Sequence, residues 1–358
     1  MERLKTPDRQ KGFNIGSPAV RHRLIFVSLL LLTLAFLLID IFSGSVNISV
    51  KEVIAALSRN SDNTLRTIIL DFRIPKAITA LLVGIALSVS GLQMQTVFRN
   101  PMAGPDVLGI SSGASLGVAI VILGFSADIT TETLRGLGNW ILIAASWAGA
   151  GAVMILIMSI SSRVRDIMTI LIIGIMLASG ISAVVTILQY FSAESMLKAY
   201  VVWTMGSLGN LTSSQLNVLL ICVALGALLS LASAKMLNAL SIGENYAGSI
   251  GLNVRLSRIL IFASTSILAG SVTAFCGPIG FIGIAVPHIS RILLRTSDHR
   301  ILVPGTILTG AIIMLVSDII SQLPGSDSVL PVNSVTSLIG IPVVIWVIFR
   351  NRKFSGTF

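Results

Sequence analysis

The sequence predicts an all-α, polytopic membrane protein. Of its 358 residues, 54% are hydrophobic and only 11% are charged, whereas soluble domains carry about 25% charged residues. Several uncharged runs exceed the roughly 18 residues that indicate a membrane-spanning helix, and one of them covers residues 77–98. A transmembrane barrel of strands is excluded because these runs are continuous and do not alternate between apolar and polar residues.

The first 23 residues are expected to form a cytoplasmic tail, because they hold six basic side chains ahead of the first apolar run. A basic segment followed by an apolar run also resembles a secretory signal peptide. The run is long, however, and no small-residue cleavage motif follows it. We therefore expect a retained first span at residues 24–42.

Apolar runs predict the remaining spans along the chain. With the first span, they cover residues 24–42, 77–98, 107–125, 140–160, 167–190, 216–233, 301–321 and 332–349. The stretch 259–290 is too long for one ordinary span and short for two, and its Gly277-Pro278 pair breaks a helix. The positive-inside rule decides between the alternatives. With two crossings, 18 of the 25 Lys and Arg residues face the cytoplasm, and with one crossing only 12 do.

Ten spans with both termini in the cytoplasm are therefore predicted, in a permease domain over residues 24–350 that precedes a cytoplasmic tail at 351–358. The Gly277-Pro278 turn must then be shielded from lipid by protein. This topology explains the net charge of +10 without a nucleic-acid partner. It places the loop RNPMAGPD (99–106) in the cytoplasm and leaves a large cytoplasmic insert at 234–258.

Span three begins with Gly109, Gly113 and Gly117, which recur every four residues on one helix face. Small residues at this spacing let two helix backbones approach closely in lipid. Tight helix packing is the favoured interpretation of this face, and a substrate-lining face is the alternative.

Side chains that could carry chemistry are scarce inside the predicted spans. Asp40 ends span one and Asp318 lies in span nine, which is thin support for a proton-coupled carrier. His288 and His299 have no partners at metal-ligand spacing, and the two cysteines form no metal or redox motif. The sequence contains no P-loop, so the chain cannot bind ATP by that route.

The insert AKMLNALSIGENYAGSIGLNVRLSR (234–258) is longer than a simple reversal of the chain requires. Its glycines permit short helices with sharp joints. The insert is interpreted either as an interfacial amphipathic helix or as a docking element for a cytoplasmic protein.

Seven stretches, in order, resemble the permease subunits of ATP-binding-cassette (ABC) importers for iron–siderophores, haem and vitamin B12. They are LDFRIPKAITALLVGIALSVSG (70–91), RNPMAGPDVLGISSGASLG (99–117), WTMGSLG (203–209), LSIGENYAGSIGLNV (240–254), GPIGFIGIAVPHISR (277–291), DHRILVPG (298–305) and LPVNSVTSLIGIP (330–342). The resemblance implies the type II importer permease fold of ten spans, in which spans two to five and seven to ten form an inverted repeat.

The same resemblance implies partners for the chain in a bacterial cytoplasmic membrane. A homodimeric or paired permease, surrounded by membrane lipid, would hold a translocation path at its interface, lined largely by residues 167–190. Two ATPase subunits would bind ATP and Mg, so this chain would hold no cofactor or metal and would not itself be an enzyme. A periplasmic or lipid-anchored binding protein would deliver the substrate.

Four residues of the insert, Gly243, Glu244, Ala247 and Gly251, match the family's coupling motif G-E-x-x-A-x-x-x-G. In relatives, short helices here fit a cleft on each ATPase and transmit its closure, which shifts the transporter between inward-open and outward-open states. The resemblance leaves two roles open for Glu244, which would either bond a residue of that cleft or cap a helix.

Four other residues match positions that narrow the cytoplasmic exit in relatives. Asn100 and Met102 match one constriction, and Ile167 and Met168 match another at the start of span five. Because the latter two are apolar, we expect that gate to close by packing and dewetting.

Arg73 and Lys76 match two arginines that pair with acidic residues of the binding protein in relatives, although both could instead be simple interfacial anchors. Lys76 cannot reproduce the bidentate geometry of Arg. Three further residues depart from the family pattern at this end, which predicts weaker docking: Gln322 replaces an Arg, Val329 a Glu and Asn333 a Gly.

The expected function is the import of an iron chelate, siderophore or haem, with vitamin B12 as the close alternative. A proton-driven secondary transporter and a passive channel are the rival classes. Asp318→Asn should abolish transport by a proton-driven carrier, whereas an ABC permease should mostly tolerate it.

Overall fold

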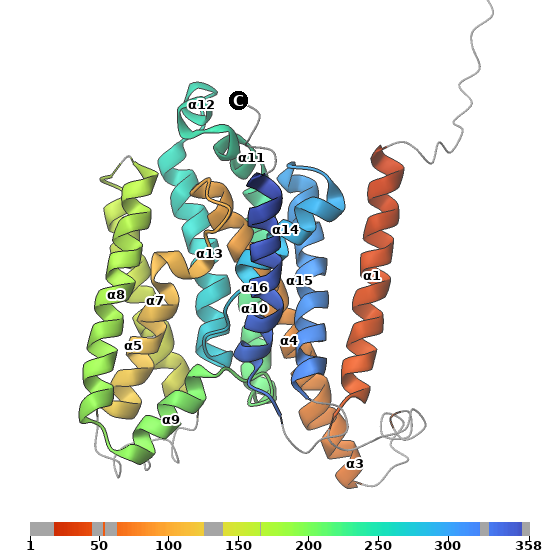
Figure 1. The fold of residues 1–358 in the computed structure, drawn as a ribbon, viewed down its shortest axis with the longest axis vertical. Coiled ribbons are helices and arrows are strands. Elements are labelled where there is room, and N and C mark those ends of the chain that lie inside the picture. Colours follow the sequence, from red (N-terminus) through yellow and green to blue (C-terminus); the bar gives the residue numbers. More distant parts are fainter. Residues whose placement is uncertain are drawn as a thin grey trace, which may run out of the picture.

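The computed structural model describes residues 18–44, 53, 63–124, 139–164, 166–322 and 329–352. Its elements are α1 (Pro18–Phe42), α3 (Asn63–Thr67), η1 (Ile68–Arg73), α4 (Ile74–Val97), η2 (Pro105–Leu108), α5 (Ile110–Leu123), α7 (Trp140–Ser161), α8 (Ile167–Phe191), α9 (Glu194–Thr204), α10 (Ser213–Ala232), α11 (Ala234–Ile242), α12 (Glu244–Ser249), α13 (Val254–Cys276), α14 (Ile282–Leu294), α15 (His299–Ser321) and α16 (Val332–Arg352). The long helices lie side by side in one bundle (Figure 1). Residues 1–17 and 353–358 of the two expected tails lie outside the described residues.

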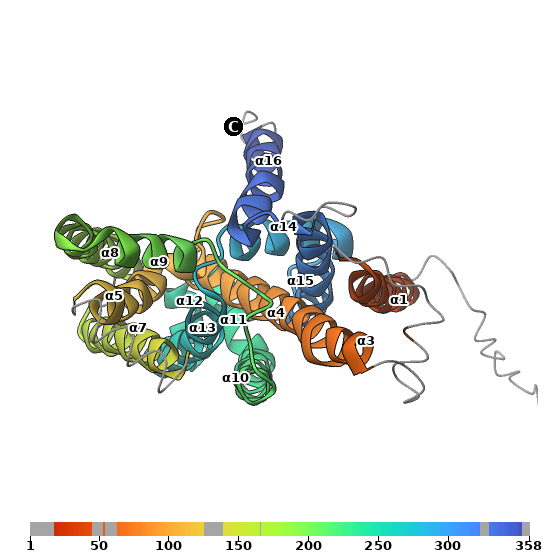
Figure 2. The ribbon, with the colours of Figure 1, turned by 90° about the horizontal axis from the view of Figure 1, so that it is seen from below.

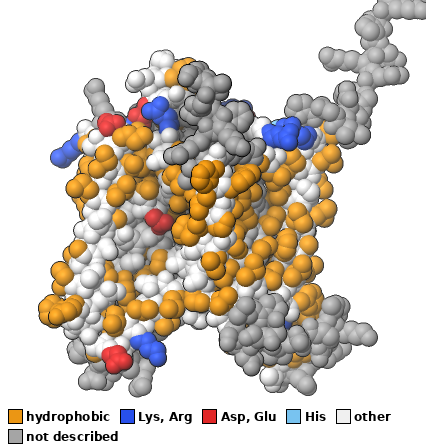
Figure 3. Space-filling view, viewed as in Figure 1, with side chains coloured by type: hydrophobic (Ala, Val, Ile, Leu, Met, Phe, Trp, Pro, Cys, Tyr) orange, Lys and Arg blue, Asp and Glu red, His pale blue; other side chains and the backbone are white. Residues whose placement is uncertain are grey.

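The described helices form a polytopic, all-helical membrane protein, as the composition predicted. Seven are long and apolar enough to cross a membrane: α1, the continuous rod of α3, η1 and α4, and α7, α8, α10, α13 and α15. Three shorter apolar helices, α5, α14 and α16, lie at the other expected positions. On the face shown in Figure 3, hydrophobic side chains cover most of the middle, and charged side chains gather towards the two ends. We name these ends by their helices: the α12 end carries α11 and α12, and the α9 end carries α3 and α9 (Figure 1).

Helices α4 and α13 form the centre of the bundle (Figure 2). Protein buries 83% of the apolar window of the α4 rod and 72% of that of α13, against 17% for α1 and 22% for α8. Glycines permit this packing, because a Cβ atom on Gly84 would overlap the carbonyl of Gly310 in α15, and one on Gly91 would overlap that of Gly283 in α14. The centre is therefore held by backbone contacts between small residues.

Two helical regions at the α9 end were not expected. Span two was predicted to begin at residue 77, but the helix begins at Asn63 and passes through the π-helical segment Ile68–Arg73. The charges at Arg66 and Asp71 end the apolar run without ending the helix, because they lie at the α9 end of the rod (Figure 1). The amphipathic helix α9 has no long apolar run and so gave no span signal.

The stretch 259–290 contains two helices, α13 and α14, as the charge bias predicted. Between them, Gly277 is buried and has φ +77°, and a Cβ atom there would lie 2.5 Å from the carbonyl oxygen of Trp203. The amide of Ser207 donates a hydrogen bond to the Cys276 carbonyl at 2.8 Å. Protein therefore covers this turn, as the sequence required.

The loop after α4 differs from the prediction, because residues 98–109 turn back into the bundle. Arg99, with φ +47°, lies beside Gly243 at the α12 end. Seven residues later, Asp106 lies in a pocket with Ala178 and Ser179 of α8, which are 11 and 12 residues along this helix, or about 17 Å from its start. Asp106 is therefore level with the middle of α8, and the part of the loop that carries it is not cytoplasmic.

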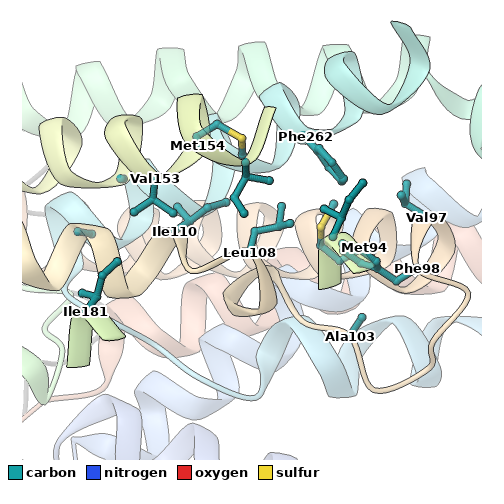
Figure 4. Packing of buried hydrophobic residues seen from close by; sticks show 14 of the residues in the cluster. Met94, Val97, Phe98, Ala103, Leu108, Ile110, Val153, Met154, Ile181 and Phe262 are labelled. Carbon is teal, nitrogen blue, oxygen red and sulfur yellow. The ribbon is translucent and has the colours of Figure 1, made fainter. Parts of the chain in front are cut away.

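Buried apolar side chains hold this re-entrant loop at both ends (Figure 4). Phe98 stacks on Phe262 of α13 with 6.0 Å between ring centroids. Leu108 and Ile110 are fully buried in the same cluster as Val153 of α7. Non-helical backbone is tolerated at membrane depth where protein encloses it or where it lines a cavity, and the loop meets this condition.

Candidate functional site

The coupling insert folds into two short helices joined at Gly243. This residue has φ +145° and ψ +152°, a conformation that favours glycine. Ala247 is fully buried and its carbonyl accepts the amide of Leu252 at 3.0 Å, which closes α12 against the following turn. Gly251, with φ +86°, turns the chain towards α13. The four motif residues therefore shape the insert, and a broad exposed surface remains for a partner.

That exposed surface of the insert includes three large apolar side chains. Ile242, Tyr246 and Ile250 are 63%, 48% and 57% exposed. Large exposed apolar side chains beyond the membrane-facing surface indicate a protein contact. The insert therefore has the composition of a docking element.

Glu244 is paired within the chain, a role that neither interpretation of the sequence included. Arg258 of α13 donates from Nε to Glu244 Oε1 at 2.8 Å, and its Nη2 pairs with Oε2. Arg258 Nη1 also donates to the carbonyl of Val164 at 3.2 Å. This bidentate pair connects α12 with α13 and with the segment that leads into α8. Arg258 belongs to no motif identified in the sequence. The one sequence feature that indicates this pair is the opposite charge of Arg258 and Glu244, which are 14 residues apart.

The predicted gate residues lie in two environments. Ile167 is 4% exposed and lines a cavity of about 550 Å³ with Arg99 and Glu244. Met102 and Met168 are 38% and 41% exposed. These residues therefore lie near the α12 end without sharing one cavity, and their role as a gate remains a prediction.

Hydrogen bonds fix the start of α8 and the loop that carries Asn100. The side chain of Asn100 accepts the amide of Met102 at 2.9 Å. Asp166 accepts the Thr169 hydroxyl at 2.7 Å and the amides of Met168 and Thr169 at 3.2 and 3.0 Å. These bonds, that of the Thr169 side chain first, lower the pKa of Asp166 below its ordinary value. The Asp166 cap therefore stabilises α8 as a carboxylate.

Arg73 and Lys76 lie at the α9 end, and both are engaged within the chain. Arg73 Nη1 donates to the carbonyls of Ile41 and Phe42 at 3.1 and 3.0 Å, and so satisfies the end of α1. Lys76 Nζ lies 3.1 Å from Oδ1 of the fully buried Asp318. Docking to a binding protein remains a prediction for both residues.

The same cluster contains Gln322, one of the three residues that depart from the family pattern. Gln322 donates from Nε2 to Asp40 Oδ1 at 2.9 Å and to Asp318 Oδ2 at 3.2 Å. Asp318 thus takes part in a buried network joining α1, α4 and α15. Its environment is that of an ion-paired structural carboxylate.

The two histidines that the sequence did not indicate as metal ligands, His288 and His299, take part in hydrogen bonds at the α12 end. His288 Nε2 lies 2.8 Å from the Pro101 carbonyl, and His299 lies 2.8 Å from Thr96 Oγ1 and 2.7 Å from Asn238 Oδ1. Among the described residues, no group of three His, Cys, Asp or Glu could hold a metal ion.

The glycines predicted to pack helices occupy different environments. Gly113 and Gly117 lie in α5, where Cβ atoms would meet the carbonyls of Gly149 and Ala145 in α7. Gly109 precedes α5, and its φ of +74° makes it the turn between η2 and that helix. Its nearest contacts to an added Cβ are at 3.5 Å, so conformation, and not close packing, explains this glycine.

Sequence reasoning missed a polar cavity at mid-depth. It has a volume of about 440 Å³ and lies between the start of α5, the middle of α8, residues 278–281 and the start of α16. Asp106 lines it together with Ser111, whose hydroxyl donates to the carboxylate. The sequence did contain an indication of this cavity, because the acidic residue Asp106 comes shortly before the serine-rich start of α5. The indication was missed because the loop was expected to lie outside the membrane.

These features define a class of protein: a helical permease whose chain re-enters the bundle between consecutive helices and which carries an insert of short helices at one end. The chain belongs to the FecCD transport family, whose profile matches residues 31–350. It is therefore an ABC transporter permease of the inner membrane, a transport component that works with ATPase and binding-protein partners. The resemblance found in the sequence is confirmed.

Three relatives illustrate the likeness. The hemin transport system permease HmuU of Yersinia pestis is 33% identical over 335 residues, which cover 93% of this chain and 98% of that protein. The vitamin B12 import system permease BtuC of Citrobacter koseri is 35% identical over 282 residues, 78% of this chain and 82% of that protein. A solved structure, described as an inward-facing metal-chelate type ABC transporter, superimposes with a TM-score of 0.78 at 28% identity over 92% of this chain and 99% of that one.

Proposed function

We propose that the chain is the membrane-spanning subunit of an importer for an iron chelate, a siderophore or haem. The observation that carries this proposal is the coupling insert, whose exposed apolar surface adjoins the segment that enters α8. Likeness over nearly the whole length of a hemin permease supports the substrate class. Import of vitamin B12 is the second candidate, supported by 35% identity to a vitamin B12 permease.

We further propose a ten-span topology with the α12 end in the cytoplasm. The excess of Lys and Arg on that side supports this orientation. Two copies of the chain would pair along α8, whose Ile172, Met176 and Ile187 are 55%, 68% and 58% exposed. Two ATPases would dock on α11 and α12 and bind ATP and Mg, and a periplasmic or lipid-anchored binding protein would dock at the α9 end.

Reconstitution tests the proposal. Proteoliposomes that contain the permease, its ATPase and its binding protein should accumulate ferric chelates, haemin or cyanocobalamin only when ATP is present. Vesicles with the permease alone should show no ATP-driven uptake. Uptake or ionic conductance by the permease alone would instead identify a secondary transporter or a channel.

A further inference from the structure

A single acidic side chain, that of Asp106, lines the mid-depth cavity. The other polar side chains along its wall are neutral, and the hydroxyls of Ser111, Ser115 and Ser182 and the amide of Asn333 are among them. No Lys, Arg or His lines this cavity. Figure 3 shows an acidic side chain in a hollow at mid-height between apolar surfaces.

The carboxylate of Asp106 has few partners for a group at this depth. Ser111 is the one hydrogen-bond donor found for it among the described residues, and neither of their two salt bridges includes it. An ionised carboxylate can accept about four hydrogen bonds. The side chain is exposed to the cavity, so most of its capacity to bind donors remains open.

Within the described residues, the hydrogen bond from Ser111 in the first turn of α5 is the structural contact found for this carboxylate. The N-cap residue of α5 is Gly109, and no side chain caps that helix. The fold at this point is held by apolar contacts, since Pro105 and Leu108 on either side of Asp106 are buried. Ionisable residues at membrane depth are costly and mark substrate paths unless they are paired. Among the described residues, one hydrogen bond from a neutral hydroxyl therefore offsets only part of the cost of Asp106 in the membrane.

On the basis of the proposed function, we propose that Asp106 and the neighbouring hydroxyl groups form a contact site for the substrate halfway along the path. The site takes a metal chelate that is neutral or cationic and presents N–H or O–H donors, such as an amide-rich or ammonium-bearing chelate. Chelates with several exposed carboxylates or other anionic groups are disfavoured, because no basic side chain balances Asp106 there.

The apolar wall next to Asp106 fits a transient contact. Ile175 of α8 lies in the pocket that also contains Asp106, and it is 47% exposed. A path must bind its substrate well enough to admit it and weakly enough to release it. One charge among neutral hydroxyls and aliphatic groups satisfies both requirements.

A cysteine reporter measures the charge selectivity of the cavity without any substrate. Ser182 is exposed in the same cavity, so Ser182→Cys, with Cys222 and Cys276 replaced by Ala, can be modified by methanethiosulfonate reagents in the assembled transporter. We expect the trimethylammonium reagent to react faster than the sulfonate reagent. Asp106→Asn should reduce this rate ratio about tenfold, because it removes the nearby charge.

Matched variants show whether Asp106 alone sets this selectivity. Asp106→Glu should retain the ratio, and Asp166→Asn, at the far end of α8, should leave it unchanged because bulk ions screen that charge. A ratio that Asp106→Asn leaves unaltered overturns the proposal, whatever the transporter carries.

Transport with three forms of one chelate then tests the substrate class. Ferric desferrioxamine B carries a terminal ammonium, its N-acetyl form is neutral and its N-succinyl form carries a carboxylate. We expect ATP-driven uptake of the ammonium form to exceed that of the succinyl form, and Asp106→Asn to narrow the difference. Equal uptake of the forms by the wild type overturns the proposal. If none of the chelates is taken up, the proposed function is contradicted. The ratio of reagent rates at the Ser182→Cys reporter tests the site independently of that outcome.

Discussion

Two breaks between consecutive helices, one from α4 to α5 and one from α13 to α14, re-enter the bundle, and the two breaks are built differently. The first, residues 98–109, enters from the α12 end and exposes Asp106 to the mid-depth cavity. The second, residues 277–281, starts at the α9 end, where Gly277 contacts Trp203, and carries no charge. They meet where Pro105 packs against Gly283.

The difference shows two solutions to one constraint, since exposed backbone polar groups are not tolerated in lipid. Both breaks line the mid-depth cavity. In the second break the Asn333 side chain accepts the Gly280 amide at 3.0 Å, and Ile279 is buried. The first break brings an acidic side chain, Asp106, to the cavity. Entry from opposite ends fits an inverted repeat of spans two to five and seven to ten. Of the two breaks, only the first carries an acidic side chain into the cavity.

The largest expected effect comes from forcing α14 away from α4, next to the place where Pro105 of the first break packs against Gly283. In Gly91→Ala, the added Cβ would overlap the Gly283 carbonyl, so α4 and α14 must move apart at a cost above about 3 kcal/mol. We expect little monodisperse protein in detergent and a lower melting temperature. Gly151→Ala is the control, because nothing lies within 4 Å of a Cβ there. Equal stability of both variants would show that the breaks do not need this contact.

A smaller effect is expected from Arg258→Ala, which tests whether the insert is tied to the segment that leads into α8. Glu244 would lose its bidentate partner, and Val164 would lose a donor. Removing one member of a largely buried pair costs about 3 kcal/mol. We expect a lower melting temperature and more ATP hydrolysed per substrate transported. Exposed Arg255→Ala is the matched control, and wild-type coupling in Arg258→Ala would refute the link.

The smallest effect should follow Asn333→Ala, which removes the α16 side chain that contacts the second break. The Gly280 amide loses its acceptor, and an unsatisfied buried donor costs about 1–3 kcal/mol. Thermal unfolding should therefore shift. Asn333 lines the same cavity but carries no charge, so the reagent ratio at the Ser182→Cys reporter should stay as in the wild type. Exposed Ser334→Ala should change neither property. A changed ratio of the two reagent rates would mean that the second break also sets the charge selectivity of the cavity.

Sequence patterns predicted the helices well, because uncharged runs report directly on transfer into lipid. They also predicted that residues 259–290 contain two helices, through the distribution of Lys and Arg. They failed at α9 and at the extension of α4, where helices continue past the apolar segment. The depth of Asp106 could not be predicted, since it depends on contacts of residues 98–109 with α8 and α14.

The candidate site was predicted only in part. The glycines of the coupling motif indicate sharp joints, which local conformation explains. The partners of Glu244, Lys76 and Asp318 come from other helices, and sequence spacing does not reveal them. Because Asp318 is buried and ion-paired, we now expect Asp318→Asn to weaken the fold. Loss of transport in that variant would therefore not indicate proton coupling.

The short length of α5 has a consequence for biosynthesis. Its 14 residues span about 21 Å, less than the roughly 30 Å hydrocarbon core, so on its own it is a poor substrate for the insertion machinery. Gly113 and Gly117 fit it closely against α7. We therefore expect α5 to enter the bilayer together with α7, as a hairpin that forms only after both segments have left the ribosome.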